Sequence, residues 1–298
     1  MKNSIFIGLV MASLSFNCLS AQEFSGKAEV FEPGVISLEN TWDEYITFSP
    51  DGKSLSFTRQ GQNLSHKGRR IYFSEKVNGK WSAPKLAPFS GDFFDRGSSF
   101  SPDGNTIYFG SNRPEKKEFD YDYDIWYSQK DSYGNWSEAE RLDDSINSDE
   151  FNEGHPYVAK SGNLYFVRFK RGVETDIYVS KLLNGKYQEP EKLNSLINTN
   201  GPESHCYIDP DERFLILGIT NKEGGMGAGD IYICYNINGK WTAPINLGDK
   251  VNSDSYEYSA KPGLDNRLYF TRARFGNPNP KAADIYSVKI ENLLKKDN

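Results

Sequence analysis

The stretch Ile71-Tyr72-Phe73-Ser74 decides the fold, because closely similar stretches return four more times along the sequence. The copies read IWYS from Ile125, IYVS from Ile177, IYIC from Ile231 and IYSV from Ile285. Successive isoleucines are 54, 52, 54 and 54 positions apart. A fixed period of this length is typical of repeat architectures, in which each copy is one supersecondary unit.

Each copy lies between two tight turns. Upstream, Phe48-Ser49-Pro50-Asp51-Gly52 leads into an apolar strand, and the same hairpin returns from Phe100 to Gly104. The Asp-Gly pair supplies the positive φ that a tight hairpin turn requires. Downstream, Asn78-Gly79-Lys80-Trp81 places an Asn-Gly turn before a further strand. Each unit is therefore predicted to be a four-stranded antiparallel meander.

The five units are expected to stack into one ring. A twisted four-stranded sheet of this size cannot bury its faces alone, and radial stacking leaves no open end. An open solenoid would require polar capping units, and none is visible in the sequence. Aromatic residues make up 14% of the 298 residues and apolar residues 37%, which suits short, half-buried strands. We predict an all-β fold: a five-bladed β-propeller with four-stranded antiparallel blades, forming a single domain over residues 22–298.

The two ends of the chain are predicted to complete the same blade. The fifth unit ends shortly after Ile285 without an Asn-Gly-Lys-Trp strand. Val30-Phe31-Glu32-Pro33 matches Trp81-Ser82-Ala83-Pro84 at an offset of 51 positions. We therefore expect the N-terminal strand to pair with the strand that contains Ile285 and to close the ring.

Residues 1–21 have the pattern of a signal peptide. Lys2 precedes an apolar run from Ile5 to Phe16, and polar residues follow Ala21. The run is shorter than the about 18–20 residues that span a bilayer, so no transmembrane span is expected. The alternative is a lipoprotein lipidated at Cys18, although the residues before it lack the small side chains of a lipobox. We expect a monomeric periplasmic or secreted protein.

The remaining cysteines, Cys206 and Cys234, are expected to stay unpaired. An oxidising compartment would permit a disulfide. However, the two residues fall on the first and third strands of one predicted blade, about 9–10 Å apart, beyond the about 7 Å limit for a bridge. We expect two buried thiols with packing roles.

The charge pattern excludes two classes of partner. The formal net charge is −6, and the longest basic cluster is Lys67-Gly68-Arg69-Arg70. Proteins that bind nucleic acid or anionic lipid carry a basic patch, which is absent from this sequence. We therefore expect neither nucleic acid nor a membrane surface as a partner.

The repeats resemble those of a known family. The Ser-Pro-Asp-Gly hairpins, the Asp-Ile-Tyr strands, the Asn-Gly-Lys-Trp-x-x-Pro strands and the segment from Gly224 to Asn252 are similar to the TolB-type, WD40-like propeller repeat. They are especially similar to envelope propellers of Bacteroidetes, which are often fused to an OmpA-like peptidoglycan-binding domain. That domain has no counterpart in this sequence, so the resemblance does not extend to peptidoglycan tethering. It implies a propeller that binds an envelope protein, because TolB is a periplasmic protein-binding propeller.

One position of the first strands is predicted to form a polar ring at a mouth of the central channel. In the first four copies, aligned on the Phe or Tyr four residues later, this position holds Glu44, Arg96, Glu153 and Glu203, and Glu257 is the expected counterpart in the looser fifth copy. Arg96 is expected to offset part of the repulsion among the acids. Two interpretations remain open: the glutamates cap backbone amides and fasten the ring, or they bind a cation such as Ca²⁺ or the hydroxyl groups of a sugar.

Two positions further along, the repeats carry two of the three histidines of the protein. The series is Ile46, Ser98, His155, His205 and Ser259. Glu153, His155, Glu203 and His205 are predicted to converge and bind a polar ligand, because a metal ion would need all its ligand atoms within about 2.0–2.2 Å. The alternative is that each imidazole only hydrogen-bonds a neighbouring strand. The acidic loop Asp120–Asp124 lacks the later Glu and central Gly of an EF-hand and is expected to be a solvated loop.

Three classes of function follow from these features. The preferred one is an exported cell-envelope binding or scaffolding propeller that recognises a protein or glycan partner through its channel mouth and rim loops. The second is a glycoside hydrolase or lyase that uses Glu153 and Glu203. The third is a structural component of an export machinery. No Gly-x-Ser-x-Gly elbow occurs, which argues against a serine peptidase. No cofactor is expected, with Ca²⁺ as the one ion considered.

Overall fold

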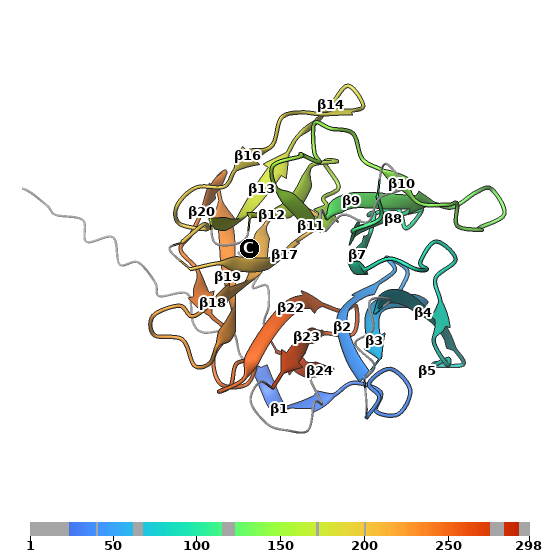
Figure 1. The fold of residues 1–298 in the computed structure, drawn as a ribbon. Helices are drawn as coiled ribbons and strands as arrows, with labels where there is room; N and C mark the ends of the chain where they lie inside the picture. Colours follow the sequence, from blue (N-terminus) through green and yellow to red (C-terminus); the bar gives the residue numbers. More distant parts are fainter. Residues whose placement is uncertain are drawn as a thin grey trace, which may run out of the picture.

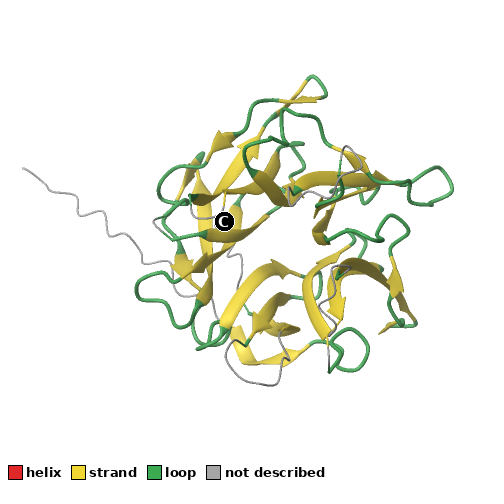
Figure 2. Ribbon diagram, viewed as in Figure 1, coloured by secondary structure: helices red, strands yellow, loops and turns green. Residues whose placement is uncertain are grey.

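The computed structural model describes residues 24–39, 41–61, 68–114, 123–170, 173–199, 201–274 and 283–291. These residues form strands, turns and loops without a helix, as predicted for an all-β fold (Figure 2). No helix that could cross a membrane occurs within these ranges. The predicted signal peptide, Cys18, the third histidine of the protein (His66) and the segment from Asp120 to Asp122 lie outside the described residues.

Five units of three long antiparallel strands follow one another along the described residues. The first strands are β2 (Thr41–Phe48), β7 (Asp95–Phe100), β11 (Asn152–Val158), β17 (Glu203–Ile208) and β22 (Tyr256–Pro262). The second strands are β3 (Ser54–Gly61), β8 (Thr106–Ser111), β12 (Leu164–Lys170), β18 (Phe214–Thr220) and β23 (Arg267–Ala273). The third strands are β4 (Arg69–Val77), β9 (Asp124–Gln129), β13 (Glu174–Ser180), β19 (Gly229–Ile237) and β24 (Ala283–Ile290). The first strands lie around the middle of the molecule (Figure 1).

Short outer strands continue each of the first four units. They are β5 (Lys80–Trp81) and β6 (Lys85–Leu86), β10 (Glu140–Arg141), β14 (Leu182–Leu183), β15 (Lys186–Tyr187) and β16 (Glu191–Lys192), β20 (Lys240–Trp241) and β21 (Ile245–Asn246). The predicted Asn-Gly turns precede three of them. Asn78 and Gly79 have φ values of 51° and 78°, the left-handed pair that a tight turn between twisted strands requires.

The N-terminal strand pairs as predicted. β1 (Phe24–Val30) lies antiparallel to β24, with Val30 opposite Tyr286. The amide of Phe31 extends this pairing by donating to the carbonyl of Ile285 at 2.8 Å. The N-terminal segment therefore adds a strand to the fifth unit, beside β24 (Figure 1).

The repeated isoleucine of the third strands forms the core between units. Ile71, Ile125, Ile177, Ile231 and Ile285 are all fully buried. Each packs with aromatic or aliphatic side chains of the second strands, such as Phe57, Phe109, Phe166 and Phe270. This burial explains why the stretch beginning at Ile71 is the strongest repeat in the sequence, since each copy must seal one face of a sheet against its neighbour.

The segment that leads from one unit to the next first strand is held by a repeated asparagine. The side-chain oxygen of Asn147 accepts a hydrogen bond from the Ile125 amide at 2.7 Å, and its Nδ2 donates to the Ile125 carbonyl at 3.1 Å. Asn198 holds Ile177, and Asn252 holds Ile231, through the same two contacts. These asparagines position the start of each following strand.

Candidate functional site

A bulge in the first strands decides which side chains are equivalent. The backbone is left-handed at Tyr45, Gly97, His155 and Ser259, with φ between 53° and 62°. The strand register shifts at each of these positions. The acids that stand two residues before the bulge are Asp43, Asp95, Glu153 and Glu257, and Glu203 holds this place in the fourth unit.

The predicted alignment of Glu44 and Arg96 with the glutamates of the later units therefore differs by one residue from the alignment in the structure. A shift of one residue moves a side chain to the opposite face of a strand. Glu44 and Arg96 thus face away from the environment of Glu153 and Glu257, and Asp43 and Asp95 take their places. The same shift makes Tyr45 and Gly97, rather than Ile46 and Ser98, the equivalents of His155.

Four of the five equivalent acids are locked in buried ion pairs. These four acids are fully buried, and their partners come from the second strand or the residues just after it. The pairs are Asp43–Arg59 at 2.6 Å, Asp95–Arg113 at 2.8 Å, Glu153–Arg168 at 2.9 Å and Glu257–Arg272 at 2.6 Å. Each arginine also donates to a carbonyl of the preceding connection, at Ile36, Phe89, Ile146 and Val251. The acid–arginine pairs thus tie each connection to its unit.

The same acids also accept hydrogen bonds from the connection itself. Glu153 accepts from the amide and hydroxyl of Ser148, and Glu257 accepts from both groups of Ser253. These serines belong to a repeated Ile/Val-Asn-Ser/Thr motif at residues 146–148, 197–199 and 251–253. Its spacing along the sequence could have revealed the contact, but the motif was not recognised from the sequence.

Glu203 differs from its four counterparts. Ile219 stands opposite it on the second strand, where Arg168 stands opposite Glu153. Its Oε1 accepts from the amide and hydroxyl of Thr199 at 2.8 and 2.6 Å, whereas its buried Oε2 has no hydrogen-bond partner among the described residues. Burial raises the pKa of Glu203 to about 7, against the lowering effect of the Thr199 contacts.

The two histidines meet in the middle of the molecule. The rings of His155 and His205 lie 4.3 Å apart, and Tyr45 lies within 5.3 Å of both. Tyr258 packs 4.9 Å from His205. Burial lowers the pKa of both imidazoles well below the ordinary value, so both are neutral at pH 7.

Glu153, His155, Glu203 and His205 were predicted to lie together. In the structure, only the two histidines contact each other. Their neighbours in space are tyrosines, while the glutamates bond Arg168, Ser148 and Thr199. No group of three or more His, Cys, Asp or Glu side chains is arranged to hold a metal ion among the residues that the structure describes. Cys206 and Cys234 are both buried free thiols.

A polar cluster lies beside the histidines, where the first strands begin. Glu44 accepts a hydrogen bond from the Tyr258 hydroxyl at 2.6 Å and pairs with the Arg69 Nε at 3.0 Å. Burial raises the pKa of Glu44, and the charges of Arg69 and, more weakly, Arg96 oppose this rise. Arg96 lies over the ring of Tyr123, at 4.1 Å from its centroid.

Half-buried aromatic rings surround these charges. Phe169 lies 5.6 Å from the centre of the Arg96 guanidinium, and the ring of Tyr256 lies 5.3 Å from that of Tyr258. Trp42 packs against the buried cluster that contains Tyr45 and Tyr258. We call the set the mouth cluster; its members are Trp42, Glu44, Arg69, Arg96, Tyr123, Phe169, Tyr256 and Tyr258. All of them except Tyr258 and Glu44 keep part of their surface exposed. Only Glu44 and Arg96 were among the predicted site residues, because the cluster draws on several different units.

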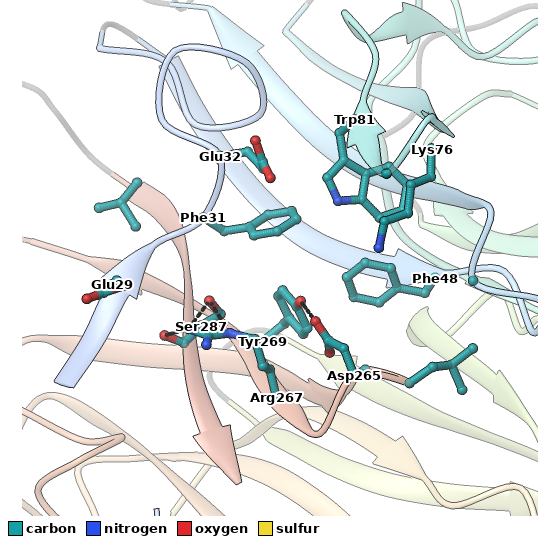
Figure 3. A pocket seen from close by; sticks show the side chains of 15 residues that line it. Glu29, Phe31, Glu32, Phe48, Lys76, Trp81, Asp265, Arg267, Tyr269 and Ser287 are labelled. Atoms are coloured by element: carbon teal, nitrogen blue, oxygen red, sulfur yellow. Dashed lines mark hydrogen bonds between the residues drawn. The ribbon is translucent and has the colours of Figure 1, made fainter. Parts of the chain in front are cut away.

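A groove opens at a separate place, between the last and first units (Figure 3). Its volume is about 370 Å³, and Phe31, Phe48, Trp81 and Tyr269 form an aromatic wall. The rings of Phe48 and Tyr269 lie 4.6 Å apart, and those of Phe31 and Tyr269 lie 5.0 Å apart. An equivalent stack of Phe73, Phe100 and Trp136 fills the next seam. The aromatic wall is therefore part of the packing between units, and the mouth cluster is the better candidate site.

Comparisons with known proteins support the fold. No family model matches the sequence, and no curated protein matches it either. Among solved structures, the BT0996 protein in its RGII complex has a TM-score of 0.56 at 9% identity, with 90% of the present protein and 91% of BT0996 covered. A glycoside hydrolase has a TM-score of 0.53 at 9% identity, with the same coverage of both proteins.

The protein is a β-propeller repeat protein. A putative TolB from Agrobacterium tumefaciens is a further similar structure, with a TM-score of 0.42 at 16% identity, covering 85% of the present protein and 90% of the TolB. At such identities the likeness concerns the fold alone, because one propeller architecture carries many unrelated functions.

Proposed function

We propose that this protein is an exported, monomeric binding propeller of the cell envelope, which follows a signal peptide at residues 1–21 and acts in the periplasm or outside the cell. Its five units form five blades of a single domain over residues 22–298, and β1 closes the ring. This ring is supported by the contacts of the first strands, which run in the order β2, β7, β11, β17 and β22 and return to β2. The partner is an envelope protein or a glycan, and it docks at the mouth cluster.

The observation that carries this proposal is that buried glutamates of the first strands form ion pairs within the fold, whereas Arg96 is partly exposed. Glu153 and Glu257 are buried against arginines and hydroxyls, so they fasten the fold. The mouth cluster, in contrast, combines a partly exposed Arg96 with half-buried aromatic rings. Apolar walls with a few polar groups fixed in place are the usual features of a binding site.

A glycan-active enzyme is the second candidate, and one observation favours it. Burial raises the pKa of Glu203 to about 7, which is the range of a general acid that works at neutral pH. The side chain is fully buried in the described structure, and its partner carboxylate would be Glu153. An enzyme would therefore need an opening that admits a glycosidic bond to these two groups.

The test is a glycan array and an envelope pull-down with residues 22–298, carried out on the wild type and on Arg96→Gln. Binding that is lost in Arg96→Gln but kept in Lys240→Gln supports the proposal, because Lys240 is an exposed lysine of an outer strand. Release of reducing ends or unsaturated sugars by the wild type, abolished by Glu203→Gln with the fold intact, would instead establish the enzyme. Retained binding in Arg96→Gln would contradict docking at the mouth cluster.

A further inference from the structure

Among the described residues, the charges around the middle of the molecule leave one arginine without an acidic partner. Arg59, Arg113, Arg168 and Arg272 each pair with a buried acid of a first strand. Arg69 pairs with Glu44. For Arg96, the contacts within the described residues are the rings of Tyr123 and Phe169.

Arg96 is nevertheless held in place. Its guanidinium lies 4.1 Å from the centroid of Tyr123 and 5.6 Å from that of Phe169, so two aromatic rings restrict its orientation. Its Nε is buried and has no hydrogen-bond partner in the described structure. Arg96 keeps part of its surface exposed, so the remaining donors of its guanidinium can reach a ligand acceptor.

The sign and size of the local charge suggest what the acceptor is. Arg69 and Arg96 carry two positive charges against the single carboxylate of Glu44, which leaves one positive charge. A guanidinium presents a planar pair of donors that matches a carboxylate in two parallel hydrogen bonds. A doubly charged phosphate would meet repulsion from Glu44, so a singly charged carboxylate fits the balance better.

The neighbouring rings suggest what carries the carboxylate. Trp42 and Tyr256 are half-buried, and both pack against the buried cluster that contains Tyr45 and Tyr258. Rigid aromatic side chains with a polar edge offer a flat apolar face and a hydrogen-bonding tip at low entropic cost. The face of a sugar ring, with apolar C–H groups and peripheral hydroxyls, suits such a surface.

We propose that the mouth cluster binds a uronic acid unit of an acidic glycan, with its carboxylate on Arg96 and its ring against Trp42 and Tyr256. The inference rests on the proposed binding function and names the chemistry of the ligand. Glu44 and Tyr258 then act as positioning residues, because they hold Arg69 at the edge of the same site.

The experiment measures binding of tetragalacturonate to residues 22–298 by isothermal titration calorimetry at low salt. The matched probe is the fully methyl-esterified tetramer, which keeps the sugar rings and removes the charge. We expect the ester to bind at least about 10-fold more weakly. Arg96→Gln should weaken the acid form by about 10-fold to 100-fold and leave the ester unchanged, whereas Lys240→Gln should change neither.

Each outcome decides the inference. Equal affinity for acid and ester, or full affinity in a folded Arg96→Gln, overturns the role of the carboxylate while the binding function stands. Preference for a peptide with a free C-terminal carboxylate over tetragalacturonate overturns the sugar and keeps a protein partner. Absence of binding to every glycan and envelope protein in the array and pull-down overturns the proposed function itself. Thermal unfolding of each variant verifies that the fold is intact.

Discussion

Replacement of Glu203 by Gln should stabilise the protein in a pH-dependent manner. Among the described residues, Glu203 is the one acid of its series that forms no ion pair with an arginine, and its pKa of about 7 lies above the value near 4.5 of an unfolded chain. The folded state therefore keeps a proton that the unfolded state releases between these two values. The stabilisation from this proton is fully present below about pH 4.5 and is lost as the pH rises through about 7.

The structure sets the size of the effect. A carboxyl that titrates at about 7 instead of 4.5 corresponds to an upper bound of about 3.4 kcal/mol, at about 1.36 kcal/mol per pH unit. Relaxation of the structure around the buried carboxylate reduces the usable figure to about 1–2 kcal/mol. Gln can keep both hydrogen bonds from Thr199 through its carbonyl oxygen and carries no charge at any pH. Glu203→Gln should thus match the wild type near pH 5 and exceed it by about 1–2 kcal/mol near pH 8.5.

Urea unfolding followed by tryptophan fluorescence at both pH values measures this difference. The matched control is Glu257→Gln, at the equivalent place in the fifth unit, where Arg272 pairs with the acid at 2.6 Å. Removal of one partner from a buried ion pair costs about 3–5 kcal/mol, so this variant should lose stability at both pH values. A Glu203→Gln variant that is less stable than the wild type near pH 8.5, or that gains equally at both pH values, would refute the reasoning.

Three other experiments test the packing of the fold. Deletion through Pro33 removes β1 from β24 and exposes the buried site of Phe24. The free energy of unfolding, measured in urea, should therefore fall by at least about 2 kcal/mol. A deletion that ends before Phe24 is the control and should leave the free energy of unfolding unchanged. Asn147→Ala removes three buried hydrogen bonds and should lower the unfolding free energy by about 1–3 kcal/mol; an unchanged urea midpoint would show that the connection is held otherwise. Burial raises the pKa of Cys206 and of Cys234 to about 12. A disulfide-exchange reagent near pH 8 should therefore label both thiols only after the protein unfolds. Rapid labelling of the folded protein would contradict the burial of these thiols.

The sequence alone determined the features that depend on neighbours along the chain. The period of the isoleucine strands predicted the units, because each copy must seal one sheet against the next. Asn78-Gly79 predicted a turn, since such a pair adopts two successive left-handed conformations with little strain. The match of Val30 to Trp81 predicted the pairing of the N-terminal strand with β24, which is a long-range contact read from a local pattern.

Only the tertiary structure decided which side chains share an environment. The bulges at Tyr45 and His155 occupy equivalent places, and Asp43 and Glu153 each stand two residues before them. The alignment on Phe48 and Tyr157 therefore placed Glu44 where Asp43 belongs. Val158, which stands opposite Leu164 as Phe48 stands opposite Leu55, is the true counterpart of Phe48. An anchor that is wrong by one residue exchanges the two faces of a strand, and only the strand pairing shows which anchor is right. The mouth cluster could not be predicted from the sequence either. Glu44, Arg96 and Tyr258 belong to three different units and lie close together because these units stack around a common middle. No local sequence pattern links residues that are brought together only by this stacking.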